Sequence, residues 1–225
     1  MAYRILFIVF FSLLVVRNSF LWINNVSSEI ILNNSTIDLS KINEELYADS
    51  LMKSAIIYIN NGEYNEAQKN IFQSIKVYRE IENLKKLGGC LNRLGTTYYY
   101  QSKYNDALGC YKESISNFEK IGYKKGISSI MNNIGAIYYF LGDYIKALDF
   151  YKNALKLQEE QNDTLLIANL NQNIGGVYLE IDDFSNSMDY LKKSIKLFED
   201  LQNNEGISLC LNSIGEVYLK EGDFD

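Results

Sequence analysis

Apolar side chains along this chain recur at steps of three and four residues, and the pattern restarts every forty residues. From Ile127 to Leu141 the apolar positions stay on one face of a helix, and a second series of the same kind starts at Tyr144. Steps of three and four residues return to the same side of an α-helix, so each series predicts one helix. Gly142 and Asp143 separate the series and predict a turn. Each unit is therefore expected to form a helix hairpin.

The forty-residue units align without an insertion and cover residues 51–90, 91–130, 131–170 and 171–210, with a partial unit at 211–225. Glycine and alanine recur at fixed columns, where a small side chain would let neighbouring helices approach closely. Tyrosine recurs at another column, where its ring can fill the wedge between helices while its hydroxyl stays near water or a partner. The predicted repeat-packing residues are Gly95, Gly135, Gly175, Gly215, Tyr98, Tyr138, Tyr178, Tyr218, Ala107 and Ala147.

A longer signature runs through the second and third units. In the third unit it reads Met131, Ile134–Gly135, Tyr138, Gly142, Tyr144, Ala147, Tyr151 and Ala154. This order of apolar, glycine, tyrosine, turn, aromatic and alanine positions resembles the tetratricopeptide repeat. The resemblance covers residues 51–225 and implies an all-α, right-handed superhelical solenoid of antiparallel helix hairpins. We expect the solenoid to occupy residues 41–225, because a helix that precedes the first unit would run into it.

Two departures from the family pattern concern the length of the second helix. The chain contains no proline, although roughly eleven would be usual at a frequency of about 5 %. The period is forty residues, whereas the family repeat has about 34. Both departures fit an extended-helix variant, similar to kinesin light chains, bacterial quorum-peptide receptors and the tetratricopeptide regions of bacterial sensor and signalling proteins.

The composition argues against an enzyme active site within these residues. The chain contains no histidine, which removes the commonest general base and excludes Ser-His-Asp and Cys-His sites. No cysteine pair has zinc spacing and no glycine-rich phosphate loop occurs. The formal charge of −6 disfavours nucleic acid as a partner. We therefore expect a binding module with no catalytic residue, no cofactor and no metal, although a catalytic domain could lie beyond the C-terminal end.

Side-chain amides are concentrated in two columns of the first helices. An amide offers both donors and acceptors, so a ladder of amides can hold a peptide backbone without reading its side chains. In the resembled family the first helices line the concave face, and asparagines at these positions hold extended peptides. Two alternatives remain, namely that the amides satisfy backbone groups between repeats or that they reflect a bias in composition. The predicted binding residues for a protein or an extended peptide are Asn92, Arg93, Asn132, Asn133, Gln172, Asn173 and Asn212.

Four aromatic residues follow the tyrosine column by one and two positions: Tyr99, Tyr100, Tyr139 and Phe140. They could form pockets for apolar side chains of a partner. Aromatic stripes at helical spacing more often belong to a core, so packing between repeats is the favoured interpretation.

The N-terminal segment resembles an export signal. A positive start at residues 1–4 precedes twelve residues with a single polar side chain, which is long enough for a signal peptide and short for a membrane span of about 20 residues. We expect residues 1–23 to be a signal peptide or a signal anchor. A buried first helix is the third alternative. Residues 24–40, rich in asparagine and serine, are expected to be a linker, and the solenoid is expected to be exported, with a membrane anchor if the signal is not cleaved.

The sequence stops just after a turn of the fifth unit, which leaves a second helix missing. A helix of a solenoid needs a following element to cover its apolar face. This favours a fragment of a longer protein as a hypothesis. The alternative function is then the N-terminal sensor region of a signal-transduction protein, with a membrane span followed by a histidine kinase or a DNA-binding regulator beyond the end.

Overall fold

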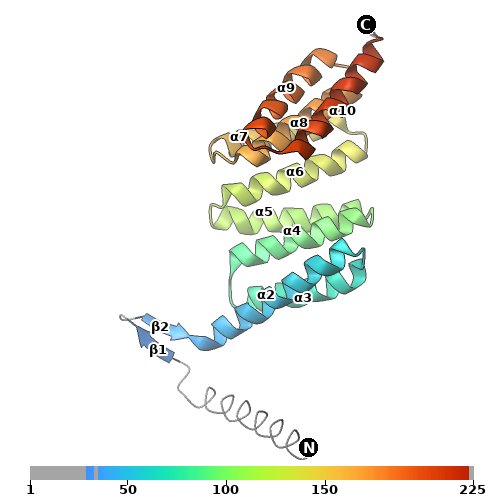
Figure 1. Ribbon diagram of the computed structural model, residues 1–225. Helices are drawn as coiled ribbons and strands as arrows, with labels where there is room; N and C mark the ends of the chain where they lie inside the picture. The colour runs from blue at the N-terminus through green and yellow to red at the C-terminus, as the bar shows by residue number, and fades with distance from the viewer. Residues whose placement is uncertain (1–28, 33–34, 223–225) are drawn as a thin grey trace, which may run out of the picture.

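The computed structural model describes residues 29–32 and 35–222 (Figure 1). This part of the chain contains nine α-helices, stacked as consecutive antiparallel hairpins from α2 at one end to α10 at the other. The expected all-α solenoid of helix hairpins is confirmed. The helices are α2 (Leu39–Asn60), α3 (Tyr64–Glu80), α4 (Leu84–Tyr100), α5 (Tyr104–Lys120), α6 (Lys124–Phe140), α7 (Tyr144–Glu159), α8 (Thr164–Glu180), α9 (Phe184–Asp200) and α10 (Asn204–Glu221).

A short β-hairpin precedes the solenoid. Strand β1 (Glu29–Leu32) pairs antiparallel with strand β2 (Ser35–Asp38), and α2 begins at the next residue, Leu39. The structure thus places regular secondary structure inside the segment 24–40, which the sequence pattern marks as a linker. The expected signal segment 1–23 lies outside the described residues. Among the helices described, none combines the length and the apolarity needed to cross a bilayer.

Helix starts recur every forty residues, because the turns recur with the same period. In most turns between the helices the second residue adopts a positive φ, which is glycine at Gly142 (φ +74°) but serine at Ser102 (φ +59°). Several of the helices, both first and second ones, begin with a side-chain cap, as where Asp143 accepts a hydrogen bond from the amide of Lys146. The positive φ therefore recurs at the same place in these turns whether or not the residue there is glycine.

At the glycine column, the first helix of a hairpin closely approaches a buried side chain of the second helix of the same hairpin. A Cβ atom at Gly95 would lie 2.5 Å from Cε1 of Tyr111, and a Cβ atom at Gly135 would lie 2.6 Å from Cε1 of Tyr151. At Gly175 the neighbour is Leu191, at 2.8 Å. Only a missing side chain is compatible with these contacts.

The last glycine of the column, Gly215, differs from the others. A Cβ atom there would meet nothing within 4 Å, since the described residues include no second helix that follows α10 and completes its hairpin. Tyr218, the last member of the tyrosine column, is likewise exposed. The predicted packing roles of these two residues are therefore not seen in this structure.

The tyrosine column is half-buried rather than deep in the core. Tyr138 stacks on Phe150 and Tyr178 stacks on Tyr190, with ring centroids 5.5 and 5.6 Å apart. The hydroxyl of Tyr178 accepts a hydrogen bond from Lys152 Nζ at 2.8 Å. The alanine column is completely buried at both Ala107 and Ala147.

Serine hydroxyls bind the hairpins together at a second column of small residues. Ser114 Oγ donates to the carbonyl of Gly88 at 2.6 Å, and Ser74 and Ser194 donate to the equivalent carbonyls of their own hairpins. In the third hairpin the direction is reversed, because Ser128 Oγ donates to the carbonyl of Ala154 at 2.9 Å. Each hairpin thus keeps one buried hydrogen bond at this place. Ala154 of this column belongs to the repeat signature, but the sequence pattern did not indicate the hydrogen bond.

An aromatic residue near the end of the second helix packs over a glycine eight residues later. Phe118 covers Gly126, and Phe198 covers Gly206. Between the third and fourth hairpins, Gln158 of α7 takes the place of the ring and Leu166 of α8 takes the place of the glycine. Gln158 is completely buried, and neither its Nε2 nor its Oε1 has a hydrogen-bond partner among the residues described.

Replacing Gln158 with leucine is expected to stabilise the protein. A buried polar group without a partner costs about 1–3 kcal/mol, and leucine fills a similar volume. We expect the free energy of unfolding to rise by about 1–2 kcal/mol, measured by chemical denaturation. Gln73→Leu on the exposed side of α3 is the control and should change it by no more than about 0.5 kcal/mol. An unchanged or lower stability of Gln158→Leu would contradict this account.

Candidate functional site

The first helices of the hairpins form one face of the solenoid. Along this face α4 contacts α6, α6 contacts α8, and α8 contacts α10. The second helices α3, α5, α7 and α9 make no comparable contacts with one another. The closer approach of the first helices bends the stack toward them, so this face is the inner side of the curve.

Two pairs of asparagines connect neighbouring first helices across this face. Asn133 Nδ2 donates to Asn92 Oδ1 at 3.0 Å, which joins α6 to α4. Asn173 Nδ2 donates to Asn132 Oδ1 at 2.8 Å, which joins α8 to α6. All four side chains are half-buried. We call these two hydrogen-bonded pairs the amide rungs.

Each amide rung leaves hydrogen-bonding capacity on the face. The NH₂ groups of Asn92 and Asn132 and the carbonyl oxygens of Asn133 and Asn173 have no partner among the residues described. An amide has two donor hydrogens and an acceptor oxygen, so one hydrogen bond does not exhaust it. Both rungs therefore fix the orientation of their amides and still offer donors and acceptors side by side.

The remaining predicted binding residues do not join a rung. The side chains of Arg93, Gln172 and Asn212 make no hydrogen bond to the described part of the protein, and Arg93 and Asn212 are exposed. A third rung would need Ser213 to reach Gln172, but Ser213 Oγ donates to the carbonyl of Leu209 in its own helix. The structure thus brings together four of the seven residues and leaves three apart.

The four aromatic residues beside the tyrosine column divide into two kinds. Tyr99 packs against Tyr104 and Phe140, and Tyr139 donates a hydrogen bond to Glu180 Oε1 at 3.2 Å. Burial and the Glu180 carboxylate raise the pKa of Tyr139 to about 12. Tyr100 and Phe140 are instead more than half exposed. Packing between repeats, the favoured interpretation, therefore describes Tyr99 and Tyr139 well and the other two only in part.

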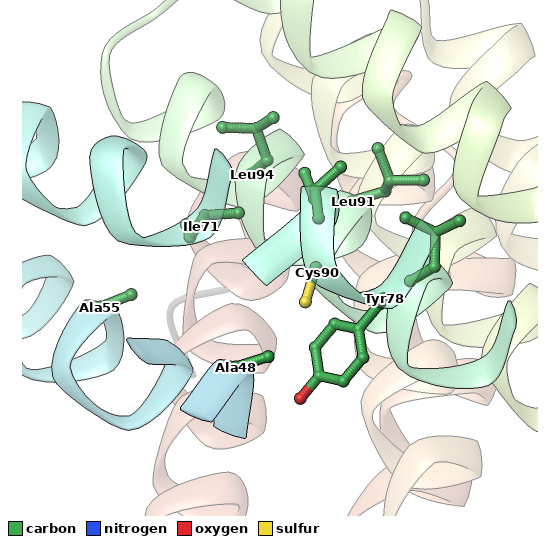
Figure 2. Close-up of a cluster of buried hydrophobic side chains, with 9 residues drawn as sticks. Ala48, Ala55, Ile71, Tyr78, Cys90, Leu91 and Leu94 are labelled. Atoms are coloured by element: carbon green, nitrogen blue, oxygen red, sulfur yellow. The ribbon is translucent and has the colours of Figure 1, made fainter. Parts of the chain in front are cut away.

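A thiol lies close to this face but is poorly placed for nucleophilic chemistry. Cys90 lies beneath this face, where it is buried beside the Tyr78 ring in a cluster of hydrophobic side chains (Figure 2). Burial raises the pKa of its thiol to about 12. A thiol at that pKa is protonated at neutral pH and is a poor nucleophile. Within the ranges described, no group of three or more histidine, cysteine, aspartate or glutamate side chains is placed to hold a metal ion. The arrangement can hold a ligand by hydrogen bonds.

Fold and face together define a helical-repeat solenoid with a polar inner surface. The sequence matches the tetratricopeptide repeat family over residues 46–120 and 126–200, so the chain belongs to this family. Repeats of this family typically act as protein-binding scaffolds. No curated protein sequence matches the chain.

Solved structures with low sequence identity share the fold. BtubC (BKLC) from P. vanneervenii has a TM-score of 0.72 at 18 % identity, over 81 % of this chain and 76 % of that one. A signal-transduction ATPase with a tetratricopeptide repeat sensor, PH0952 from Pyrococcus horikoshii, has a TM-score of 0.70 at 16 % identity, over 78 % of this chain and 28 % of that one. A Rap protein in complex with competence and sporulation factor has a TM-score of 0.68 at 16 % identity, over 80 % of this chain and 50 % of that one. At these identities the likeness extends to the fold alone.

Proposed function

We propose that this protein is a peptide-binding scaffold that holds an extended peptide along its inner face, without catalysis by these residues. The observation that carries the proposal is the pair of amide rungs on successive first helices. An extended backbone presents a donor and an acceptor at every residue, and each rung offers both. The rungs would therefore hold the main chain of a peptide whatever its side chains.

Preorganisation supports this proposal. A free asparagine would have to be immobilised on binding, and ordering a side chain opposes association. Here each amide is already oriented by a partner on the neighbouring helix. The peptide would bind to a surface whose side-chain entropy has been lost on folding. The Rap protein solved with competence and sporulation factor supports the proposal by its similar fold.

Replacing Asn132, Asn133 and Asn173 together with alanine tests the proposal. The triple variant removes both rungs, and we expect it to bind peptides at least about tenfold more weakly, since several hydrogen bonds are lost. Capture would be measured with immobilised protein and a synthetic library of random nonapeptides. Helical content, measured by circular dichroism, should stay unchanged, because alanine favours helix.

Asparagines on the second helices provide the matched control. Asn65, Asn105 and Asn153 are exposed on α3, α5 and α7 and make no side-chain hydrogen bond to the described part of the chain. Their triple replacement with alanine should leave capture unchanged. Equal capture by the two triple variants would assign the rungs to structure and reject the proposal.

We propose as a second candidate that the repeats are the sensor region of a signal-transduction protein. The similarity to the tetratricopeptide repeat sensor of PH0952 favours it, because in that protein the repeats form only part of a longer chain. The apolar segment at residues 5–16 supports an exported location for either function. The sequence of the complete gene would decide between them, because a sensor requires an effector domain.

A further inference from the structure

An open hollow of about 510 Å³ lies on the edge of the solenoid, where α6 turns into α7 and α8 turns into α9. The residues that line it are Leu141, Gly142, Asp143, Tyr144, Ile145 and Ile181. Its apolar side chains face solvent, since Ile145 is 78 % exposed and Leu141 is 55 % exposed. None of the asparagines of the amide rungs lines it, so this hollow is separate from the surface proposed to hold a peptide.

The repeat does not require apolar residues at this place. In the second unit the place of Leu141 is taken by Gln101. The place of Ile145 is taken there by Asn105. Both units nevertheless form the same helix hairpin. The exposed apolar side chains of the hollow are therefore not explained by the fold, and exposed apolar groups that lie together typically mark a binding surface.

Carboxylates outnumber cations around the hollow. Those that line it or adjoin Ile181 in the chain are Asp143, Glu180, Asp182 and Asp183. Lys146 Nζ lies 2.6 Å from Asp143 Oδ2, and Lys220 Nζ lies 3.5 Å from Asp182 Oδ1. Glu180 and Asp183 form no ion pair within the part of the chain described. Hydrogen bonds from Asn186 hold the pKa of Asp183 below its usual range, so this carboxylate stays ionised at neutral pH.

The charge of this rim discriminates between kinds of occupant. Two copies of the chain joined at their hollows would bring two acidic rims together, and like charges across an interface oppose association. An anionic lipid surface is disfavoured for the same reason, since such surfaces attract basic segments. A segment of another protein that carries lysine or arginine beside apolar side chains matches both the apolar lining and the acidic rim.

We infer that this hollow docks a basic segment of a partner protein. An apolar side chain of that segment enters the hollow between the two turns, and its lysine or arginine side chains pair with Glu180 and Asp183. Added salt weakens the ionic part of the contact, because both carboxylates are open to solvent. The site goes beyond the proposed peptide-binding function, and a partner docked here leaves the amide rungs free.

Three synthetic peptides test the inference on the full chain. The first is an amphipathic peptide of lysine and leucine, the second replaces every lysine with glutamate, and the third replaces every leucine with serine. Binding would be measured by fluorescence anisotropy at an ionic strength of about 0.15 M, where long-range charge effects are screened. The wild type should bind the lysine–leucine peptide at least about tenfold more tightly than either of the others, because only that peptide has both properties.

Substitutions taken from the chain's own repeats locate the binding. Leu141→Gln combined with Ile145→Asn introduces the residues of the second unit, so helical content should stay unchanged while the lysine–leucine peptide binds about tenfold or more weakly. Glu180→Gln combined with Asp183→Asn removes two charges without changing shape and should weaken binding by about threefold or more. Ile57→Asn is the control, because Ile57 is an equally exposed isoleucine on α2 outside the hollow, and it should leave binding unchanged.

Several results would overturn the inference. Equal binding of the three peptides, or undiminished binding by the Leu141→Gln, Ile145→Asn variant, would reject the docking site. A dimer seen by analytical ultracentrifugation and lost in that variant would assign the hollow to a second copy of the chain. Binding to phosphatidylcholine vesicles that is lost in the same variant would assign it to a lipid surface. Each of these results would leave the peptide-binding scaffold standing, because the amide rungs are intact in every variant.

Discussion

Phe118→Ala is expected to lower the free energy of unfolding by about 3–5 kcal/mol. The ring is 4 % exposed and fills the space above two glycines of neighbouring first helices, since a Cβ atom at Gly88 or at Gly126 would lie 2.5 Å from it. It also meets the Tyr123 ring edge-on, with centroids 5.0 Å apart. Alanine would leave a cavity between two hairpins that glycine backbones cannot fill. Chemical denaturation followed by circular dichroism measures the loss.

An exposed phenylalanine on another second helix controls for the change in composition. Phe72 lies on α3 and is 50 % exposed, so Phe72→Ala removes the same atoms from a site with much less packing. It should cost far less than Phe118→Ala. Similar losses for the two variants would contradict the assigned role of Phe118 as a wedge between repeats. Because solenoid repeats depend mainly on their neighbours, the unfolding transition of Phe118→Ala should also broaden.

Gly135→Leu is expected to lower the free energy of unfolding by about 1–3 kcal/mol, in spite of the better helix propensity of leucine. Its Cβ atom alone would lie 2.6 Å from the Tyr151 ring. Tyr151 is 3 % exposed and cannot turn into solvent without opening the hairpin. The measurement is again chemical denaturation at neutral pH.

Gly215 offers a control from the same column of the repeat. A Cβ atom there would have open space, so Gly215→Leu should leave stability unchanged or raise it by up to about 1 kcal/mol through helix propensity. Because the same substitution is made at both positions, a loss of stability at Gly135 without a loss at Gly215 would report on packing and not on the leucine itself. A melting temperature unaffected by Gly135→Leu would be incompatible with the close approach of α6 and α7.

Much of the fold could be predicted from the sequence because it is local and repeated. Helix spacing of apolar residues and the turn at residues 141–143 depend on neighbours within a few positions, and the forty-residue period multiplies the signal. The glycine column was recognisable because only glycine permits such close helix contact, as at Gly95 and Gly135. The hydrogen bond of Ser128, in which the first helix supplies the donor, was not predicted, because a serine on either helix can donate to a carbonyl of the other.

The candidate site was predicted less completely. The amide columns identified the four residues of the rungs, but the sequence could not say that Asn133 pairs with Asn92, 41 positions away, while Asn212 pairs with no residue that the structure describes. A cavity lined by Lys85, Lys86, Arg93 and Lys125 was not predicted, although Lys85 and Lys125 share one repeat column. Such groupings depend on how successive hairpins are rotated against one another.

The sequence by itself therefore determined the number and length of the helices in each unit, the repeat period and the absence of histidine chemistry. These follow from local backbone preferences and from composition. The tertiary structure alone decided which amides meet, which tyrosines are buried and where positive charge collects. Those properties arise from contacts between hairpins, whose geometry is set by packing across residues distant in the chain.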